Sequence, residues 1–289
     1  MRFQRRWFRT CFILPIICLI VVFFLAYKLY DWNRDIEWSG WEHSTASFSH
    51  HLCVLVPFRN REDELVKFVP HLKNFLLDQG IENEIIVLNQ TDSFRFNRAS
   101  LINVGWFESD RIGCDYVVMH DVDLLPLNKE LDYSYPGDGV VRHISAPEYH
   151  PKYNYAKFIG GILMLTTLDF KKVNGMSNKY WGWGLEDDEF YLRIRDASFR
   201  IDRPFGLDTD RKTTFLHIHG SNRKRDYTKK SKKTESERAE KRKRDKYGGL
   251  STIRYRIGNR SRLLYDSFPI SILHIQLECD IDKYSYCLP

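Results

Sequence analysis

The stretch Cys114–Pro126, CDYVVMHDVDLLP, decides the fold, because an apolar strand in it runs directly into two closely spaced carboxylates. Its first part, Cys114–Met119, has the apolar character of a buried strand. Asp121 and Asp123 follow where that strand ends. Ligands of open α/β sheets bind beyond the carboxyl ends of the strands. Carboxylates there can hold a divalent cation together with a nucleotide diphosphate, although Asp-x-Asp alone is often only a turn.

Two earlier segments have the same strand character. His51–Phe58, HLCVLVPF, is a continuous apolar run, and Asn83–Leu88, NEIIVL, is the second. The segment Glu64–Leu77 between them has apolar residues at helical spacing, and Pro70 inside it predicts a kink or a break. Another helix follows the second strand, with Asn97 as its cap. This alternation predicts an α/β fold with a mostly parallel central sheet and flanking helices.

All three predicted strands end in polar residues. Arg59 and Arg61 follow the first strand, and Asn89 to Asp92 follow the second. Because the carboxyl ends of parallel strands share one edge of a sheet, we expect these side chains to lie near Asp121 and Asp123. The two arginines suit a diphosphate, whereas the alternative for them is a pair of surface residues.

A second informative stretch is Trp181–Phe190, WGWGLEDDEF. Its three consecutive acids, Glu186 to Asp188, repel one another, which indicates a use as a base and as acceptors for a hydroxyl-rich ligand. Trp181 and Trp183 offer flat apolar faces that suit a sugar ring. The alternative is an exposed acidic first turn of a helix, with the two tryptophans as core residues. In either case the stretch starts a helix that runs to about Ala197.

The second half of the chain supplies two histidines. Phe158–Leu165 is predicted as a strand with a glycine pair, and Leu168–Val173 as a helix. Thr213–His219, TTFLHIH, alternates like a strand, which places His217 and His219 on one face. Two such imidazoles form a natural metal pair. With Asp123 they predict an Asp/His/His metal site that leaves positions for diphosphate oxygens.

The N-terminus predicts a membrane anchor. Cys11–Tyr27 is an uncharged apolar run that follows four arginines, which is typical of a single-pass type II anchor. The rival reading, a cleaved signal peptide, lacks a clear cleavage site. The predicted organisation is a cytoplasmic tail (1–10), an anchor (11–27), a stem (28–50) and a lumenal catalytic domain (51–289) with a basic flexible loop (221–246).

A lumenal domain would lie in an oxidising compartment. Cys279 and Cys287 enclose a short polar loop, so we expect them to pair. Cys53 and Cys114 each start a predicted strand, and they either pair or remain two buried thiols. Two Asn-x-Ser/Thr tripeptides, at Asn89 and Asn259, are candidate glycosylation sites.

The charge of the chain is unevenly distributed. The net charge is +6, but Arg223–Lys246 alone holds 13 Lys and Arg against 5 Asp and Glu, so the remaining residues carry a net −2. The basic character is therefore local and solvated, and we expect no nucleic-acid partner. Because this segment follows the two histidines, it could also move over a bound nucleotide.

Five motifs together resemble one known family, the beta-1,4-galactosyltransferases, over roughly Leu52 to Asp226. They are FRNRE at Phe58–Glu62, FNRA at Phe96–Ala99, DVD at Asp121–Asp123, WGWGLEDDEF at Trp181–Phe190 and HIHG at His217–Gly220. The His-x-His ending and the short stem look most like members that add galactose to xylose in the proteoglycan linker.

The resemblance implies a GT-A fold, Mn²⁺, inversion at the sugar carbon, and a type II membrane protein of the Golgi. It implies transfer from UDP-galactose to the 4-hydroxyl of xylose on xylosylated proteoglycan core proteins, in heparan and chondroitin sulfate synthesis. Asp187 would be the catalytic base, and Asp123, His217 and His219 would bind the metal. The implied substrate-binding residues are Arg59, Arg61, Phe96, Arg98, Asp121, Val122, Tyr155, Trp183, Gly184, Glu186 and Asp188.

Two other functions compete with this one. The first is galactosyl transfer to N-acetylglucosamine, against which the His-x-His pattern speaks. The second is a non-catalytic, sugar-binding Golgi protein, against which the intact Asp123, Asp187, His217 and His219 speak.

Overall fold

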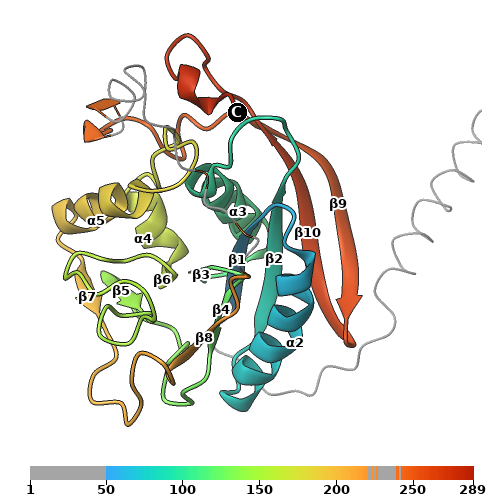
Figure 1. Cartoon of the computed structure of the whole chain (residues 1–289), viewed down its shortest axis with the longest axis vertical. Coiled ribbons are helices and arrows are strands. Elements are labelled where there is room, and N and C mark those ends of the chain that lie inside the picture. The colour runs from blue at the N-terminus through green and yellow to red at the C-terminus, as the bar shows by residue number, and fades with distance from the viewer. Residues whose placement is uncertain (1–49, 221–222, 224–225, 227–238, 241) are drawn as a thin grey trace, which may run out of the picture. The chain divides into compact units, whose positions relative to one another are not determined.

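Figure 1 shows the protein as a computed structural model, which describes residues 50–289 apart from 221–222, 224–225, 227–238 and 241. The predicted cytoplasmic tail and anchor lie outside the described residues, as do the stem up to residue 49 and most of the basic loop. Within the described part of the chain, no helix has both the length and the apolar character needed to cross a membrane.

The described residues form a central sheet with helices on its faces. In chain order the elements are β1 (Leu52–Phe58), α2 (Glu62–Asp78), β2 (Asn83–Gln90), α3 (Arg98–Ile112), β3 (Tyr116–His120), β4 (Leu124–Pro126), β5 (Val140–His143), β6 (Ile162–Thr166), α4 (Thr167–Lys172), α5 (Glu186–Asp196), β7 (Arg200–Asp202), β8 (Phe215–His217), β9 (Tyr255–Tyr265) and β10 (Phe268–Leu277), with a short 3-10 turn at Ser285–Cys287. The main sheet has the strand order β7-β5-β6-β3-β1-β2-β10-β9, and β4 pairs with β8 separately.

The main sheet is mixed, which corrects the prediction of a mostly parallel one. Its four central strands, β3, β1, β2 and β10, are parallel to one another. On the flanks, β6 is antiparallel to both β3 and β5, and β9 is antiparallel to β10. The last pair is a long hairpin whose turn residues, Asp266 and Ser267, both have positive φ. A two-residue turn of this kind can join only antiparallel strands.

Of the two outcomes predicted at Pro70, a kink or a break, the break is wrong, because helix α2 continues through this residue. Proline removes one backbone donor, and the carbonyl four residues earlier belongs to Val66. Val66 is 55% exposed, so water can reach that side of the helix. The apolar face formed by Leu65, Phe68 and Leu72 is fully buried against the sheet, and its packing outweighs the one lost bond.

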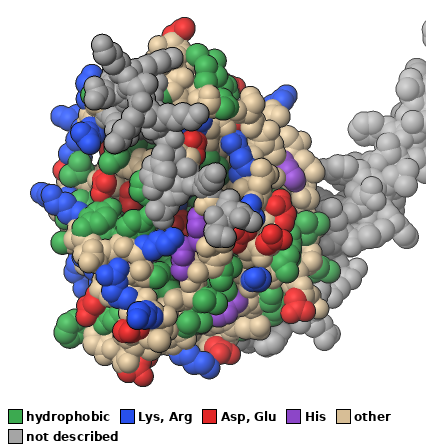
Figure 2. All heavy atoms as spheres, viewed as in Figure 1, with side chains coloured by type: hydrophobic (Ala, Val, Ile, Leu, Met, Phe, Trp, Pro, Cys, Tyr) green, Lys and Arg blue, Asp and Glu red, His purple; other side chains and the backbone are tan. Residues whose placement is uncertain are grey.

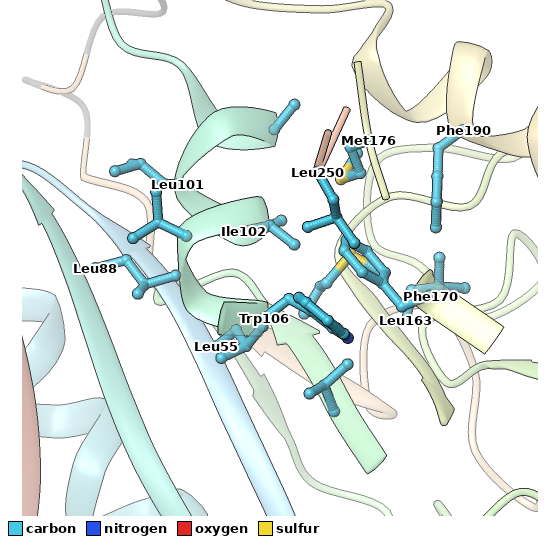
Figure 3. Packing of buried hydrophobic residues seen from close by; sticks show 14 of the residues in the cluster. Leu55, Leu88, Leu101, Ile102, Trp106, Leu163, Phe170, Met176, Phe190 and Leu250 are labelled. Carbon is cyan, nitrogen blue, oxygen red and sulfur yellow. The ribbon is translucent and has the colours of Figure 1, made fainter. Parts of the chain in front are cut away.

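Helix α3 covers the opposite face of the sheet from α2. Asn97 caps it as predicted, because its side chain accepts a hydrogen bond from Ser100 N. Gly113 ends it with φ 84°. Figure 3 shows the core on this side, where α3 residues meet the sheet and the segments around α4 and α5: Leu55, Leu88, Leu101, Ile102, Trp106, Leu163, Phe170, Met176, Phe190 and Leu250.

Two predicted strands are shorter than expected. The strand predicted at Phe158–Leu165 is β6, which begins only at Ile162, after Gly161 with φ 78°. The strand predicted at Thr213–His219 is β8, which has three residues. In each case a residue left out of the strand, Gly160 before β6 and His219 after β8, lies at the candidate site described below.

The structure contains two disulfides. Cys279 pairs with Cys287 as predicted, and Cys53 pairs with Cys114, which settles the choice between a bond and two thiols. Cys53 lies on β1, while Cys114 stands just before the adjacent strand β3. Their Cα atoms are 5.8 Å apart, so neighbouring strands bring them within bonding reach.

Candidate active site

Asp123, His217 and His219 form a compact group of potential metal ligands. One ligand atom from each lies within 4.8 Å of the others. Asp123 Oδ2 is 2.8 Å from His219 Nδ1 and 3.8 Å from His217 Nε2. The two imidazoles are stacked, with ring centroids 5.5 Å apart. One carboxylate and two imidazoles suit a borderline divalent cation, so the residues present fit a transition metal.

Strand pairing brings these three residues together. β4 follows directly after Asp123 and pairs antiparallel with β8, so that Leu124 lies opposite His217. The chain then continues beyond β8, where Ile218 N donates to Asp123 O at 2.9 Å. Burial opposes ionisation of Asp123, but the hydrogen bond from His219 and the neighbouring His217 and Arg61 lower the pKa of its carboxyl overall. Asp123 is therefore held as the anion that a cation needs.

The predicted arginines lie at the same edge of the sheet. Arg61 Nη1 is 3.9 Å from Asp123 Oδ2, beside the metal group. Arg59 is held by the loop after β2, because it donates to the carbonyls of Gln90, Asp92 and Phe94. Its guanidinium carbon stands 6.0 Å from the ring centroid of Phe96, in cation–π range. Figure 2 shows histidine side chains near the centre of this face, with acidic and basic side chains around them.

Arg98 connects the aspartate pair with the acidic helix. Its Nε and Nη2 atoms each lie 2.9 Å from Asp121 Oδ1. Burial would lower the pKa of Arg98, but the charges of Asp121, Glu186 and Asp187 raise it overall. Burial in turn raises the pKa of Asp121, against the effect of Arg98. The positive charge of Arg98 thus interacts both with Asp121, just after β3, and with the acids at the start of α5.

The three predicted acids occupy the first turn of α5. Leu185 precedes them with φ 78° and offers no side-chain cap, so the acids themselves face the positive end of the helix. Burial, then Glu186, then Asp188 raise the pKa of Asp187 to about 7. A carboxylate with that pKa can accept a proton from a hydroxyl near neutral pH.

Gly160 leaves the space that Asp187 occupies. A Cβ atom at this position would lie 2.8 Å from Asp187 Oδ2 and 2.8 Å from the ring of Phe158. Any larger residue would therefore push the carboxylate aside. The predicted glycine pair thus permits a close approach, here by the side chain of Asp187.

The aromatic residues around the acids divide into two kinds. Trp181 is buried in the core, so the prediction of a sugar-binding face is wrong for it. Trp183 is 46% exposed and Tyr155 is 43% exposed. The Tyr155 hydroxyl lies 3.5 Å from Asp188 Oδ1. An aromatic ring offers an apolar face that a sugar ring can pack against, and a carboxylate can accept hydrogen bonds from sugar hydroxyls.

The remaining predicted residues lie in varied surroundings. Val122 is buried between the two aspartates of the motif, and Gly184 has φ 99°, which favours glycine. Of the two candidate glycosylation residues, Asn259 is exposed on the edge strand β9. Asn89 is partly buried in β2, with its amide nitrogen 3.4 Å from His274 Nδ1.

Two buried charged residues at this edge were not predicted. Glu64 is 5% exposed and accepts hydrogen bonds from Arg61 and Arg223. Arg95 is 8% exposed and donates to both oxygens of Asp226. Glu64 stands three residues after Arg61 in a helical segment, which was a usable signal. Arg95 and Asp226 are 131 residues apart, and no local pattern relates them.

Comparisons with known proteins agree with this geometry. A family model described as the N-terminal domain of galactosyltransferase matches residues 141–219, and one described as the N-terminal region of glycosyl transferase group 7 matches residues 28–136. Xylosylprotein 4-beta-galactosyltransferase of Caenorhabditis elegans is 53% identical over 275 residues, which cover 94% of this chain and 95% of that protein. Beta-1,4-galactosyltransferase 7 of Homo sapiens is 48% identical over 248 residues, covering 86% and 74%.

Among solved structures, the chain is similar to a mutant of Drosophila beta-1,4-galactosyltransferase 7 in complex with manganese, UDP-Gal and xylobiose. The TM-score is 0.78 and the sequence identity is 50%, and the match covers 83% of this chain and 99% of that one. The catalytic domain of the same enzyme in complex with xylobiose matches equally well, with a TM-score of 0.78 and 50% identity.

Proposed function

The chain belongs to the beta-1,4-galactosyltransferase family, and from this premise we propose that it transfers galactose from UDP-galactose to the 4-hydroxyl of xylose, with inversion. The fold that carries the reaction is of the GT-A type, with a mixed central sheet. The observation that carries the proposal is Arg98, which is hydrogen-bonded to Asp121 of the aspartate motif and whose pKa is raised by the charges of Asp121, Glu186 and Asp187. A metal–diphosphate site and a base thereby share one edge of the sheet.

Asp187 is the general base of the proposed reaction. A sugar hydroxyl is a weak nucleophile at neutral pH, so its proton must leave as the new bond forms. Burial, Glu186 and Asp188 raise the pKa of Asp187 to about 7, which matches the base to this task. A single displacement with one base inverts the configuration and requires no protein nucleophile.

The nucleotide side of the site is cationic. Asp123, His217 and His219 would hold Mn²⁺, which as a Lewis acid stabilises the negative charge on departing UDP. Arg59 and Arg61 stand where a diphosphate would need cationic donors. The C. elegans and Drosophila relatives support the xylosyl acceptor and the manganese.

The acceptor side is aromatic and acidic. Trp183 and Tyr155 are both partly exposed and would pack against sugar rings, while Glu186 and Asp188 would accept hydrogen bonds from sugar hydroxyls. The proposed acceptors are xylosylated core proteins of proteoglycans. The support for this finer statement is the xylosylprotein specificity in the name of the C. elegans relative.

A turnover assay tests the proposal. Purified full-length protein would be incubated with UDP-galactose, Mn²⁺ and either a β-xyloside or an N-acetylglucosaminide. We expect a galactosylated xyloside from the wild type and little from Asp187→Asn. Product on the glucosaminide alone would overturn the acceptor and keep the mechanism. UDP binding without product on either acceptor would show a sugar-binding protein instead.

We also propose that the catalytic domain is lumenal and that Cys11–Tyr27 anchors it in the Golgi membrane. The supporting observations are the arginines before this apolar run and the two disulfides, which form in oxidising compartments. Asn259, which is exposed, is the stronger candidate for glycosylation. Removal of N-glycans from the cellular protein should increase its mobility on a gel, and Asn259→Gln should abolish most of that shift.

A further inference from the structure

We propose that Glu64 is a positioning residue for the metal site, which holds the imidazole of His219 in its ligating orientation through Arg223. The inference rests on the proposed function, because it concerns the same metal site. Glu64 lies on α2, outside the set of residues that the motifs predict. Its role follows from a chain of contacts that ends at Asp123.

The first link is the burial of the Glu64 carboxylate. The residue is only 5% exposed, and a buried carboxylate is stable only when it is paired. Arg223 donates to it through two nitrogens, Nε to Oε1 and Nη2 to Oε2, each at 3.0 Å. Arg61 Nη1 donates to Oε1 at 3.0 Å. Burial opposes ionisation of Glu64, but the two arginines lower the pKa of its carboxyl overall.

The second link is the backbone of Arg223. Its carbonyl lies 2.9 Å from His219 Nε2, and a carbonyl can only accept, so Nε2 carries a hydrogen. The other ring nitrogen, Nδ1, faces Asp123 Oδ2 at 2.8 Å, so it is the nitrogen on the side where a cation held by Asp123 would lie. Metal-binding histidines are oriented in this way by a partner of the second nitrogen.

Three hydrogen bonds of its side chain hold Arg223 in place. Nε and Nη2 donate to Glu64, and Nη1 donates to Asn60 O at 2.8 Å. The carbonyl that orients His219 therefore depends on the carboxylate of Glu64.

Besides holding Arg223, Glu64 also holds Arg61. Its Nη1 stands between two carboxylates, 3.0 Å from Glu64 Oε1 and 3.9 Å from Asp123 Oδ2. Loss of the Glu64 charge would let Arg61 move toward Asp123, where a cation would meet competition. Both consequences weaken cation binding, whereas a purely structural Glu64 would change stability and leave the affinity of the folded protein unaltered.

The test measures Mn²⁺ affinity directly, without substrate turnover. Full-length protein is titrated with Mn²⁺ alone, and free Mn²⁺ is followed by electron paramagnetic resonance. We expect Glu64→Gln to weaken binding by about tenfold or more. Glu62→Gln, an exposed residue in the same helical turn, should bind as the wild type does. Arg223→Ala should also weaken binding, and the double variant should lose no more than Glu64→Gln alone, because the contact with Arg223 is already lost there.

Several outcomes would overturn the inference. Wild-type affinity in folded Glu64→Gln or in Arg223→Ala would do so, as would additive losses in the double variant. Arg223 is only partly buried, so its variant keeps the test valid if Glu64→Gln fails to fold. Absence of Mn²⁺ binding by the wild type would instead overturn the proposed metal, and with it the proposed function.

Discussion

Asp187 is the residue whose protonation controls the proposed reaction. Its carboxyl must be ionised to act as a base, and burial, Glu186 and Asp188 raise its pKa to about 7. We therefore expect kcat/KM to fall tenfold per pH unit below about pH 7. Glu186→Gln removes one of the charges that raise this pKa, so the bend in the profile should move to lower pH. Initial rates measured from about pH 5 to about pH 9 would show this. An unchanged or higher bend would contradict the electrostatic explanation.

The same shift has a consequence for stability. The ordinary pKa of this carboxyl is 3.8, and the raised value means that the folded state holds the proton more tightly than the unfolded state. Asp187 therefore contributes to the free energy of unfolding in a way that depends on pH. Its contribution is fully present below about pH 4 and is lost as the pH rises through about 7.

Asp187→Asn should separate activity from stability. The variant should lose about 10²- to 10⁴-fold in kcat, because no base remains. It should not unfold earlier than the wild type at pH 8, since it buries no charge there. Thermal unfolding of both proteins at pH 5 and pH 8, followed by circular dichroism, shows the sign of the difference in stability at each pH. The prediction would be refuted if the variant melted at a lower temperature than the wild type at pH 8 but not at pH 5.

At the scale of elements, α5 carries the acids on its first turn and is fixed at its other end by Arg193. This arginine is buried and forms an ion pair with Glu189, with Nε 2.9 Å from Oε2. It also donates to the carbonyls of Gly175, Asp245 and Gly248. The helix that carries Asp187 is thus attached to the backbone at Gly175 and to a segment 52 to 55 positions further along the chain.

Arg193→Met should therefore be strongly destabilising. It leaves the buried carboxylate of Glu189 and several carbonyls without their donor, at a cost of about 3–5 kcal/mol. Arg195→Met, on the exposed side of the same helix, should change stability by less than about 0.5 kcal/mol. Urea unfolding of both variants makes the comparison. Equal effects would show that the buried pair has no special role.

The connection into β6 provides a test of how the base is placed. Gly160→Ala puts a methyl group only 2.8 Å from Asp187 Oδ2, so we expect a loss of at least about tenfold in kcat/KM. Gly258→Ala is the matched control, because its Cβ would meet only His274 O at an ordinary 3.7 Å. Galactosyl transfer by both variants would be measured. Wild-type activity of Gly160→Ala would show that the carboxylate can move without consequence.

At the scale of the whole molecule, the two disulfides constrain chain segments of very different length. Cys53 and Cys114 are separated by 61 positions, and Cys279 and Cys287 by 8. Closing the longer loop removes more entropy from the unfolded chain, roughly 4 kcal/mol against roughly 2.5 kcal/mol. The double-alanine variant of the first pair should therefore lose more stability in guanidinium unfolding. The reverse order would indicate that strain or residual structure outweighs loop entropy.

Local patterns in the sequence were sufficient for much of this protein. Apolar runs and their spacing predicted the strands β1, β2 and β3, the helices between them, and the cap at Asn97. Because consecutive parallel strands present their ends at one edge, Asp123 could be related to arginines some sixty residues earlier. The alternation before His217 and His219 placed both rings on one side. These inferences succeed because the spacing of apolar residues and the direction of a strand are set by residues that are close together in the sequence.

Contacts between distant residues required the tertiary structure. Sequence period carries no information about which strands become neighbours, so neither the Cys53–Cys114 bond nor the antiparallel flanks of the sheet could be derived. Burial was a second feature that the sequence did not reveal. Trp181 lies in the core, and burial raises the pKa of Asp187. Glu64 is buried too, and it pairs with Arg223, which is 159 positions away. The residue types at the site follow from the sequence, whereas their protonation and orientation depend on packing that only the folded chain creates.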